Sequence, residues 1–104
     1  MKVIDALYTY GYRDRKLDKV IKKMKHGDSM YGLHVIVLPL CQDGLLEIYV
    51  YNQLLQPYYR SLGDDVCVLG VASDKAGAEE LVLNIIQDMY DAGYEFDVKG
   101  FFGI

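Results

Sequence analysis

The hydrophobic pattern predicts two amphipathic helices. The clearer one begins after Ser73 or Asp74, either of which can cap the helix, and Gly93 ends it. Its apolar positions recur at helical spacing and are Ala78, Leu81, Val82, Ile85, Ile86 and Met89. The opposite side carries Glu79, Glu80, Asn84, Gln87, Asp88 and Asp91. The other helix is predicted over residues 14–27, with an apolar stripe of Leu17, Val20, Ile21 and Met24.

Two apolar runs predict an antiparallel hairpin. Residues 31–40 are almost continuously apolar and indicate an interior strand that ends at Pro39, which has no backbone donor. Residues 45–51 indicate the second strand, in which Glu47 is the one charged residue. Between them, the sequence CQDG at 41–44 is typical of a turn.

A third strand is predicted over residues 64–73, which are apolar on both faces and therefore suit a central position in a sheet. Residues 52–63 precede it and predict a helix, in which Pro57 either starts the regular helix or bends it. Since a helical crossover permits parallel strands, we expect a mixed sheet.

The two ends of the chain carry less definite patterns. Ile4, Leu7 and Tyr8 have helical spacing, yet residues 4–12 also alternate as a strand would. Of these alternatives we favour the helix, with Gly11 as its cap. Residues 94–98 alternate as well and allow an edge strand at the end of the chain.

These elements predict an α/β (α+β) fold. We expect one domain over residues 1–104, with a three- to four-stranded mixed sheet in the order α-β-β-α-β-α and helices mainly on one face. A chain of 104 residues has the length of one domain. Residues 1–27 would be a basic helical segment and residues 30–102 the sheet-and-helix core.

Charge is distributed unevenly along the chain. The net charge is −4, but residues 1–27 carry eight Lys or Arg against three Asp, and the remainder carries three against twelve acidic residues. The basic segment could bind an anionic partner. We favour the alternative, in which it packs beside the acidic remainder of its own chain or of a sister subunit. Because the isoelectric point is about 5.0, nucleic acid is not an expected partner.

Several classes of protein are not indicated. Cys41 and Cys67 lie far apart, and with His26 and His34 they show no zinc-ligand spacing, so we expect neither a metal nor a cofactor. No catalytic arrangement follows from these residues, and the pattern leans against an enzyme. There is no apolar run of about 18 residues, and no secretion signal is evident, so we expect a cytoplasmic protein without a membrane segment.

The junction between the third strand and the last helix is one candidate binding site. Gly70, Ser73, Lys75 and Gly77 surround a helix N-terminus, where free N–H groups favour anions. The segment matches neither of the common glycine-rich phosphate-binding motifs. Helix capping by Ser73 or its neighbour is the simpler interpretation.

A tyrosine-rich segment is a second candidate. The chain has ten Tyr and no Trp, and Tyr49, Tyr51, Tyr58 and Tyr59 lie close together in the sequence beside Arg60. Tyrosine and arginine are enriched in recognition surfaces, so this group is a candidate protein interface. Ordinary packing at the edge of the core is the alternative.

The segments LLEIYVYNQLLQPYYRSL, DDVCVLGVASDKAGAEELV and YDAGYEFDVKGFF resemble a group of small bacterial proteins of about this length that have no assigned activity. The resemblance covers residues 30–102. It implies a bacterial, cytoplasmic setting and carries no site residues.

The function that we expect is a non-enzymatic protein-interaction module, acting as a homodimer and binding a protein partner of unknown identity. A chain of this size has difficulty covering three apolar helix stripes and two strands that are apolar on both faces, and exposed apolar patches mark interfaces. The alternative is a small-molecule or anion sensor that uses the Gly70–Gly77 junction.

Overall fold

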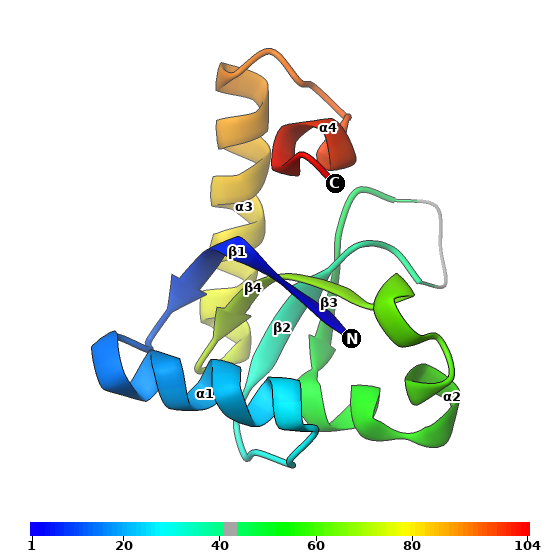
Figure 1. Cartoon of the computed structure of the whole chain (residues 1–104). Helices are drawn as coiled ribbons and strands as arrows, with labels where there is room; N and C mark the ends of the chain where they lie inside the picture. The colour runs from blue at the N-terminus through cyan, green and yellow to red at the C-terminus, as the bar shows by residue number, and fades with distance from the viewer. Residues whose placement is uncertain (41–43) are drawn as a thin grey trace.

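Four strands form one mixed sheet in the order β1-β4-β2-β3 in the computed structural model, which describes residues 1–40 and 44–104 (Figure 1). Their bounds are β1 Lys2–Tyr10, β2 His34–Val37, β3 Glu47–Val50 and β4 Cys67–Ala72. β1 is parallel to β4, whereas β2 is antiparallel to both β4 and β3. The α/β fold class with a mixed sheet is therefore confirmed, and so is the hairpin. The expected turn falls largely on residues 41–43, outside the described residues.

The helical elements follow the predicted order. They are α1 Asp14–His26, the 3-10 turn η1 Tyr51–Leu55, α2 Pro57–Arg60, the 3-10 turn η2 Gly63–Asp65, α3 Lys75–Asp91 and α4 Val98–Phe102. The predictions for α1 and α3 are confirmed. The single helix expected over residues 52–63 is divided, because Gln56 is extended and Pro57 begins a new helix, where its missing N–H costs nothing.

Residues 1–12 were expected to be helical, and this is wrong, since β1 covers most of them. The strand-like alternation is the pattern that agrees with the structure. Pairing with β4 provides hydrogen-bond partners for the backbone of β1, and this outweighs the local helical spacing. Gly11 then turns the chain with a φ of +80°. A side chain at Gly11 would place its Cβ 1.9 Å from Ser73 Oγ, so only glycine fits there.

The end of the chain also differs from expectation. Residues 98–102 form α4 and not an edge strand. Asp97 caps this helix by accepting a hydrogen bond from the Gly100 N–H at 3.0 Å. Phe102 meets Tyr8 of β1 edge to face, with 5.9 Å between ring centroids. Packing of these rings outweighs the short alternating pattern.

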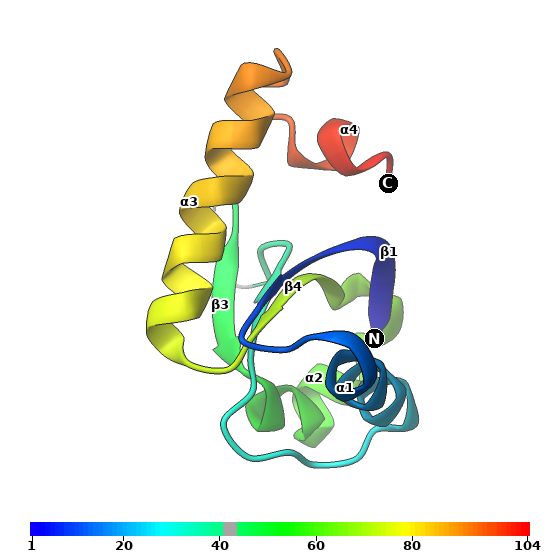
Figure 2. The ribbon, with the colours of Figure 1, turned by 90° about the vertical axis from the view of Figure 1, so that its left-hand side faces the viewer.

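Helices cover both faces of the sheet, which corrects the expectation of one main face (Figure 2). On one face, Val20 and Met24 of α1 join Val35 and Val37 of β2 in a core cluster with η1. On the other, Ile36 joins the buried stripe of α3, and α4 packs there too. The alternation of side chains along β2 sends its residues to the two faces in turn.

The central position predicted for the third strand is confirmed, since every residue of β4 is buried. Its parallel neighbour, however, is β1. The connection from β3 to β4 joins strands that are separated by β2.

Candidate functional site

The strand-to-helix junction is occupied by the end of β1. The Asp74 carboxylate accepts a hydrogen bond from the Gly77 N–H at 2.6 Å, so the cap comes from the chain itself. A Cβ at Gly77 would lie 2.2 Å from a ring carbon of Tyr10, which shows how closely that ring covers the first turn of α3. The Ser73 N–H donates to the Tyr10 carbonyl at 3.1 Å. These contacts fill the space beside the helix N-terminus.

The other predicted residues of the junction have packing or solvent roles. Gly70 lies under Ile36, and a Cβ there would lie 3.0 Å from Ile36 Cδ1 and 3.3 Å from the Tyr8 carbonyl oxygen. Lys75 is exposed at the start of α3. The structure thus gathers Gly70, Ser73, Lys75 and Gly77 in one region, with the two glycines serving close approach.

The tyrosine-rich segment is divided between core and surface. Tyr49, Tyr58 and Tyr59 form an edge-to-face series, with ring centroids 5.6 Å apart for Tyr49 and Tyr59 and 5.0 Å apart for Tyr58 and Tyr59. Tyr51 is fully buried and donates its hydroxyl to the Asp28 carbonyl at 2.9 Å. Burial raises the pKa of Tyr51. Only Tyr58 offers a largely exposed ring.

Arg60 connects α2 to the end of α1. Its Nε donates to the Leu55 carbonyl at 2.6 Å, and its Nη2 donates to the Gly27 carbonyl at 3.2 Å. Gly27 ends α1 with a φ of +80°. Arg60 therefore has a clear position, fixed by backbone oxygens of two segments.

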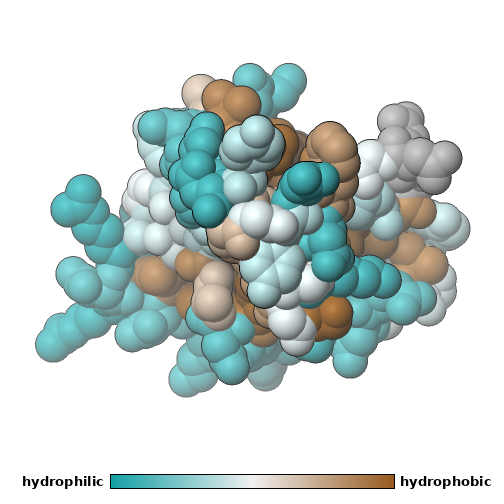
Figure 3. Space-filling view, turned by 90° about the horizontal axis from the view of Figure 1, so that it is seen from above, coloured by the Kyte–Doolittle hydropathy of each residue, from teal (hydrophilic) through white to brown (hydrophobic). Residues whose placement is uncertain are grey.

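Sequence reasoning missed a group of apolar residues on one flank of α3, which we call the β3–α3 patch. Leu83, Ile86 and Tyr90 are exposed to 68%, 37% and 72%. Val50 of β3 is exposed to 49%. The patch consists of these four exposed residues together with Ile48 and Val82, which are half-buried and pack against the core cluster on the α3 face. Seen from above, hydrophobic residues reach the surface in several places among polar ones (Figure 3).

The strand order locates this patch. Asp88 accepts a hydrogen bond from Tyr8 of β1, so that side of α3 faces the β1 edge of the sheet. Ile86 and Tyr90 are each two residues from Asp88, about 200° round the helix, and so lie on the side toward β3. β3 is the terminal strand on that side of the sheet, next to β2. α3 packs on β1, β4 and β2, and β3 extends beyond this cover.

A periodic signal for the patch exists in the sequence. Leu83, Ile86 and Tyr90 stand at i, i+3 and i+7, the spacing of a second helical stripe. Ile86 had been assigned to the buried stripe, and the structure corrects this, whereas Ala78, Leu81, Ile85 and Met89 are buried as expected. Because this exposed stripe lies next to the buried stripe on the helix, the sequence pattern did not distinguish the two.

The Lys and Arg side chains of α1 form no ion pair with acidic residues in the described part of the chain. Across residues 1–40 and 44–104, the ion pairs join the Met1 amino group to Asp64 and His26 to Asp28. The Lys and Arg side chains of α1 are all exposed. The expected pairing within the chain is therefore absent from the described part, and pairing with a sister subunit stays a prediction.

The remaining chemistry of the described residues is limited. Cys67 is a buried free thiol, and burial raises its pKa. Within the described ranges, His, Cys, Asp and Glu side chains nowhere gather in a group of three or more that could hold a metal ion. No helix in this part of the chain is long and apolar enough to cross a membrane.

Comparisons of the chain with models of protein families, with curated proteins and with solved structures find no match.

Proposed function

We propose that this protein is a non-enzymatic interaction module that forms a homodimer through the β3–α3 patch. The observation that supports this most directly is the exposure of Leu83 and Tyr90 on the helix beside an apolar terminal strand, whose Val50 is also half exposed. Large apolar residues that adjoin one another at a surface are typical of interfaces.

A second copy is the occupant that fits this surface. β3 is a terminal strand with an unbroken register against β2, and among the described residues no strand lies beyond it. Two copies of β3 related by a two-fold axis can pair antiparallel, which would extend the sheet to eight strands and bring the two copies of β3 into contact. The side of α3 that carries Ile86 and Tyr90 would then face the second copy.

The opposite edge of the sheet is unsuited to the same contact. Between Val3 and Tyr8, β1 advances five residues while β4 advances two, from Val68 to Gly70. This bulge, with Asp5 exposed in it, disrupts the outer side of β1. The β3 edge is therefore the one that supports pairing.

The test is light scattering after gel filtration of the whole chain. We expect twice 11.9 kDa for the wild type and 11.9 kDa for Tyr90→Glu and for Val50→Lys. Tyr58→Glu is the matched control, since it makes the same change at an exposed tyrosine on α2, and it should stay dimeric. A monomeric wild type at high concentration would refute the proposal. A monomeric Tyr58→Glu beside a dimeric Tyr90→Glu would move the interface to the tyrosine-rich segment.

We place this module in the bacterial cytoplasm, as the resemblance implies, and the buried free thiol of Cys67 suits a reducing compartment. Affinity capture from a cell extract can identify a further protein partner. The alternative, a sensor at the Gly70–Gly77 junction, stays a prediction, and the cap by Asp74 together with the cover by Tyr10 weighs against it.

A further inference from the structure

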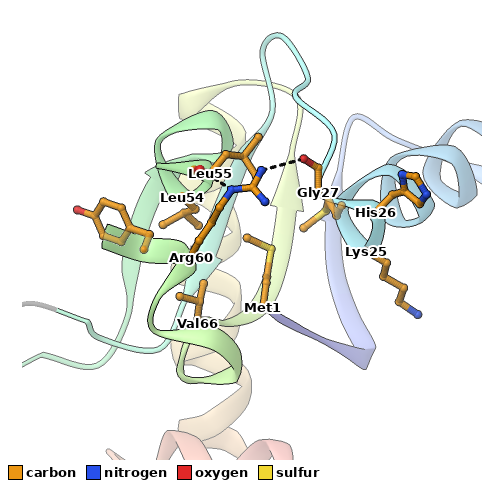
Figure 4. Close-up of a pocket in the computed structure, with 10 residues that line it drawn as sticks. Met1, Lys25, His26, Gly27, Leu54, Leu55, Arg60 and Val66 are labelled. Atoms are coloured by element: carbon orange, nitrogen blue, oxygen red, sulfur yellow. Dashed lines mark hydrogen bonds between the residues drawn. The ribbon is translucent and has the colours of Figure 1, made fainter. Parts of the chain in front are cut away.

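A cavity of about 250 Å³ lies between the end of α1 and the η1–α2 segment (Figure 4). Met1, Leu55 and Tyr59 line the cavity and are half-buried, packed against the core cluster on this face, so they supply its accessible apolar walls. Arg60 extends across the cavity toward Gly27, and Met1 and Val66 lie beneath its guanidinium group. The cavity thus combines apolar walls with one fixed cation.

Arg60 is held in place without being neutralised. Both of its recorded hydrogen bonds go to backbone carbonyls, those of Leu55 and Gly27, and neither carries a formal charge. Within the described residues, no carboxylate lies within ion-pair distance of its guanidinium. Because two bonds already orient the planar group, little side-chain freedom is left to lose when an anion binds.

The surroundings of Arg60 are positively charged as well. The ten residues that line the cavity include Lys25 and His26 and no Asp or Glu. In Figure 4, Lys25 and His26 are directed away from Arg60, so Arg60 is the group positioned for direct contact.

We propose that this cavity binds a small monocarboxylate, whose carboxylate pairs with Arg60 and whose short hydrocarbon part or ring lies against Met1, Leu55 and Tyr59. A guanidinium group matches a carboxylate in geometry and charge. The half-buried apolar side chains favour a ligand with an apolar part over inorganic phosphate, which can pair with Arg60 but buries no apolar surface against them. The volume is below the roughly 300 to 1,000 Å³ of sites for drug-sized ligands, so the ligand is small.

The test is a titration of the isotope-labelled whole chain, followed by backbone amide NMR signals. Benzoate is the probe, and benzamide is its uncharged analogue of the same shape. We expect saturable shifts centred on Gly27, Leu55 and Arg60 with benzoate and none with benzamide. Equal responses to the two compounds, or none to benzoate, would overturn the proposal. This comparison uses the wild-type protein and depends on no variant.

Two variants then assign the contact. Arg60→Gln should weaken benzoate binding about tenfold or more, the size expected for a lost charge-assisted hydrogen bond. Lys22→Gln removes a cation of α1 that does not line the cavity and should leave the affinity unchanged. Equal losses of benzoate affinity in both variants would show that the effect comes from the overall positive charge of the protein, and this would contradict the proposed site. Inorganic phosphate that bound as tightly as benzoate would contradict the ligand class.

Discussion

The hydroxyl of Tyr8 donates a hydrogen bond to a carboxylate oxygen of Asp88, with 2.6 Å between the two oxygens. This bond ties the edge strand β1 to the C-terminal half of α3, across 80 residues of sequence. Burial, followed by the hydrogen bond and the charge of Asp88, raises the pKa of Tyr8 to about 12. The phenol must keep its proton to donate, so the tie persists while Tyr8 is neutral.

This bond predicts a pH dependence of stability. In the unfolded chain tyrosine titrates at about 10, so as pH rises the unfolded state loses the proton first. The contribution of Tyr8 is then complete below about pH 10 and is lost as pH rises toward 12. Urea unfolding should show a smaller fall in stability over this range for Tyr8→Phe than for wild type. Tyr58→Phe should follow the wild-type curve, and a Tyr8→Phe curve parallel to wild type would refute the mechanism.

The buried stripe of α3 predicts where stability is concentrated. Ile85 is fully buried, so Ile85→Ala removes core methyl groups and should cost about 2–5 kcal/mol of unfolding free energy. Glu80 is exposed on the same helix, and Glu80→Ala should change stability by less than about 0.5 kcal/mol. Chemical denaturation measures both. Comparable losses would show that Ile85 is not part of the core.

The close approach of the Tyr10 ring to Gly77 predicts that Gly77→Ala has opposite effects on stability in the presence and in the absence of that ring. In the wild type, Gly77→Ala should destabilise, because the new Cβ meets the Tyr10 ring. In a Tyr10→Ala background the same substitution should stabilise by up to about 1 kcal/mol, since alanine is the better helix former. Thermal unfolding of the four proteins completes the double-mutant cycle. The same sign in both backgrounds would mean that the ring does not restrict Gly77.

Because the Lys and Arg side chains of α1 lack ion-pair partners among the described residues, we predict that neutralising two of them changes the free energy of unfolding very little. Lys19 and Lys22 are exposed and make no ion pair with the described residues. The double variant Lys19→Gln and Lys22→Gln should therefore keep its unfolding free energy within about 0.5 kcal/mol of wild type. Denaturation at low salt is the stringent condition, because screening is weakest there. A loss well above this value would reveal pairing with the acidic remainder after all.

The spacing of apolar residues correctly predicted the helices that pack one side against the sheet. Val20 and Met24 of α1 and Ile85 of α3 are buried where the 3.6-residue pattern placed them. Residues 2–10 satisfied two periods at once, and only the presence of β4 as a partner, more than 50 residues away, decides between them. Local pattern holds no information about that pairing.

The candidate sites could be predicted only in part. The Asp74 cap follows from helix chemistry, but the cover of Gly77 by Tyr10 depends on β1 being a strand. Likewise, the position of Tyr51 and Arg60 in one short segment of sequence could not show that Tyr51 lies in the core and that Arg60 reaches the Gly27 carbonyl. The exposure of Leu83 and Tyr90 depends on how far α3 extends over the sheet, which is a property of the packing.

The bulge in β1 also bears on how many copies an assembly can contain. A sheet with two regular edges can add copies at both and grow into a fibre. Here the residues between Val3 and Tyr8 interrupt one edge, while β3 keeps a regular register at the other. Pairing through β3 uses the regular edge of each copy and leaves only interrupted edges outside. In the proposed dimer the irregularity of β1 would thus limit the stoichiometry, because strand pairing would stop at two copies.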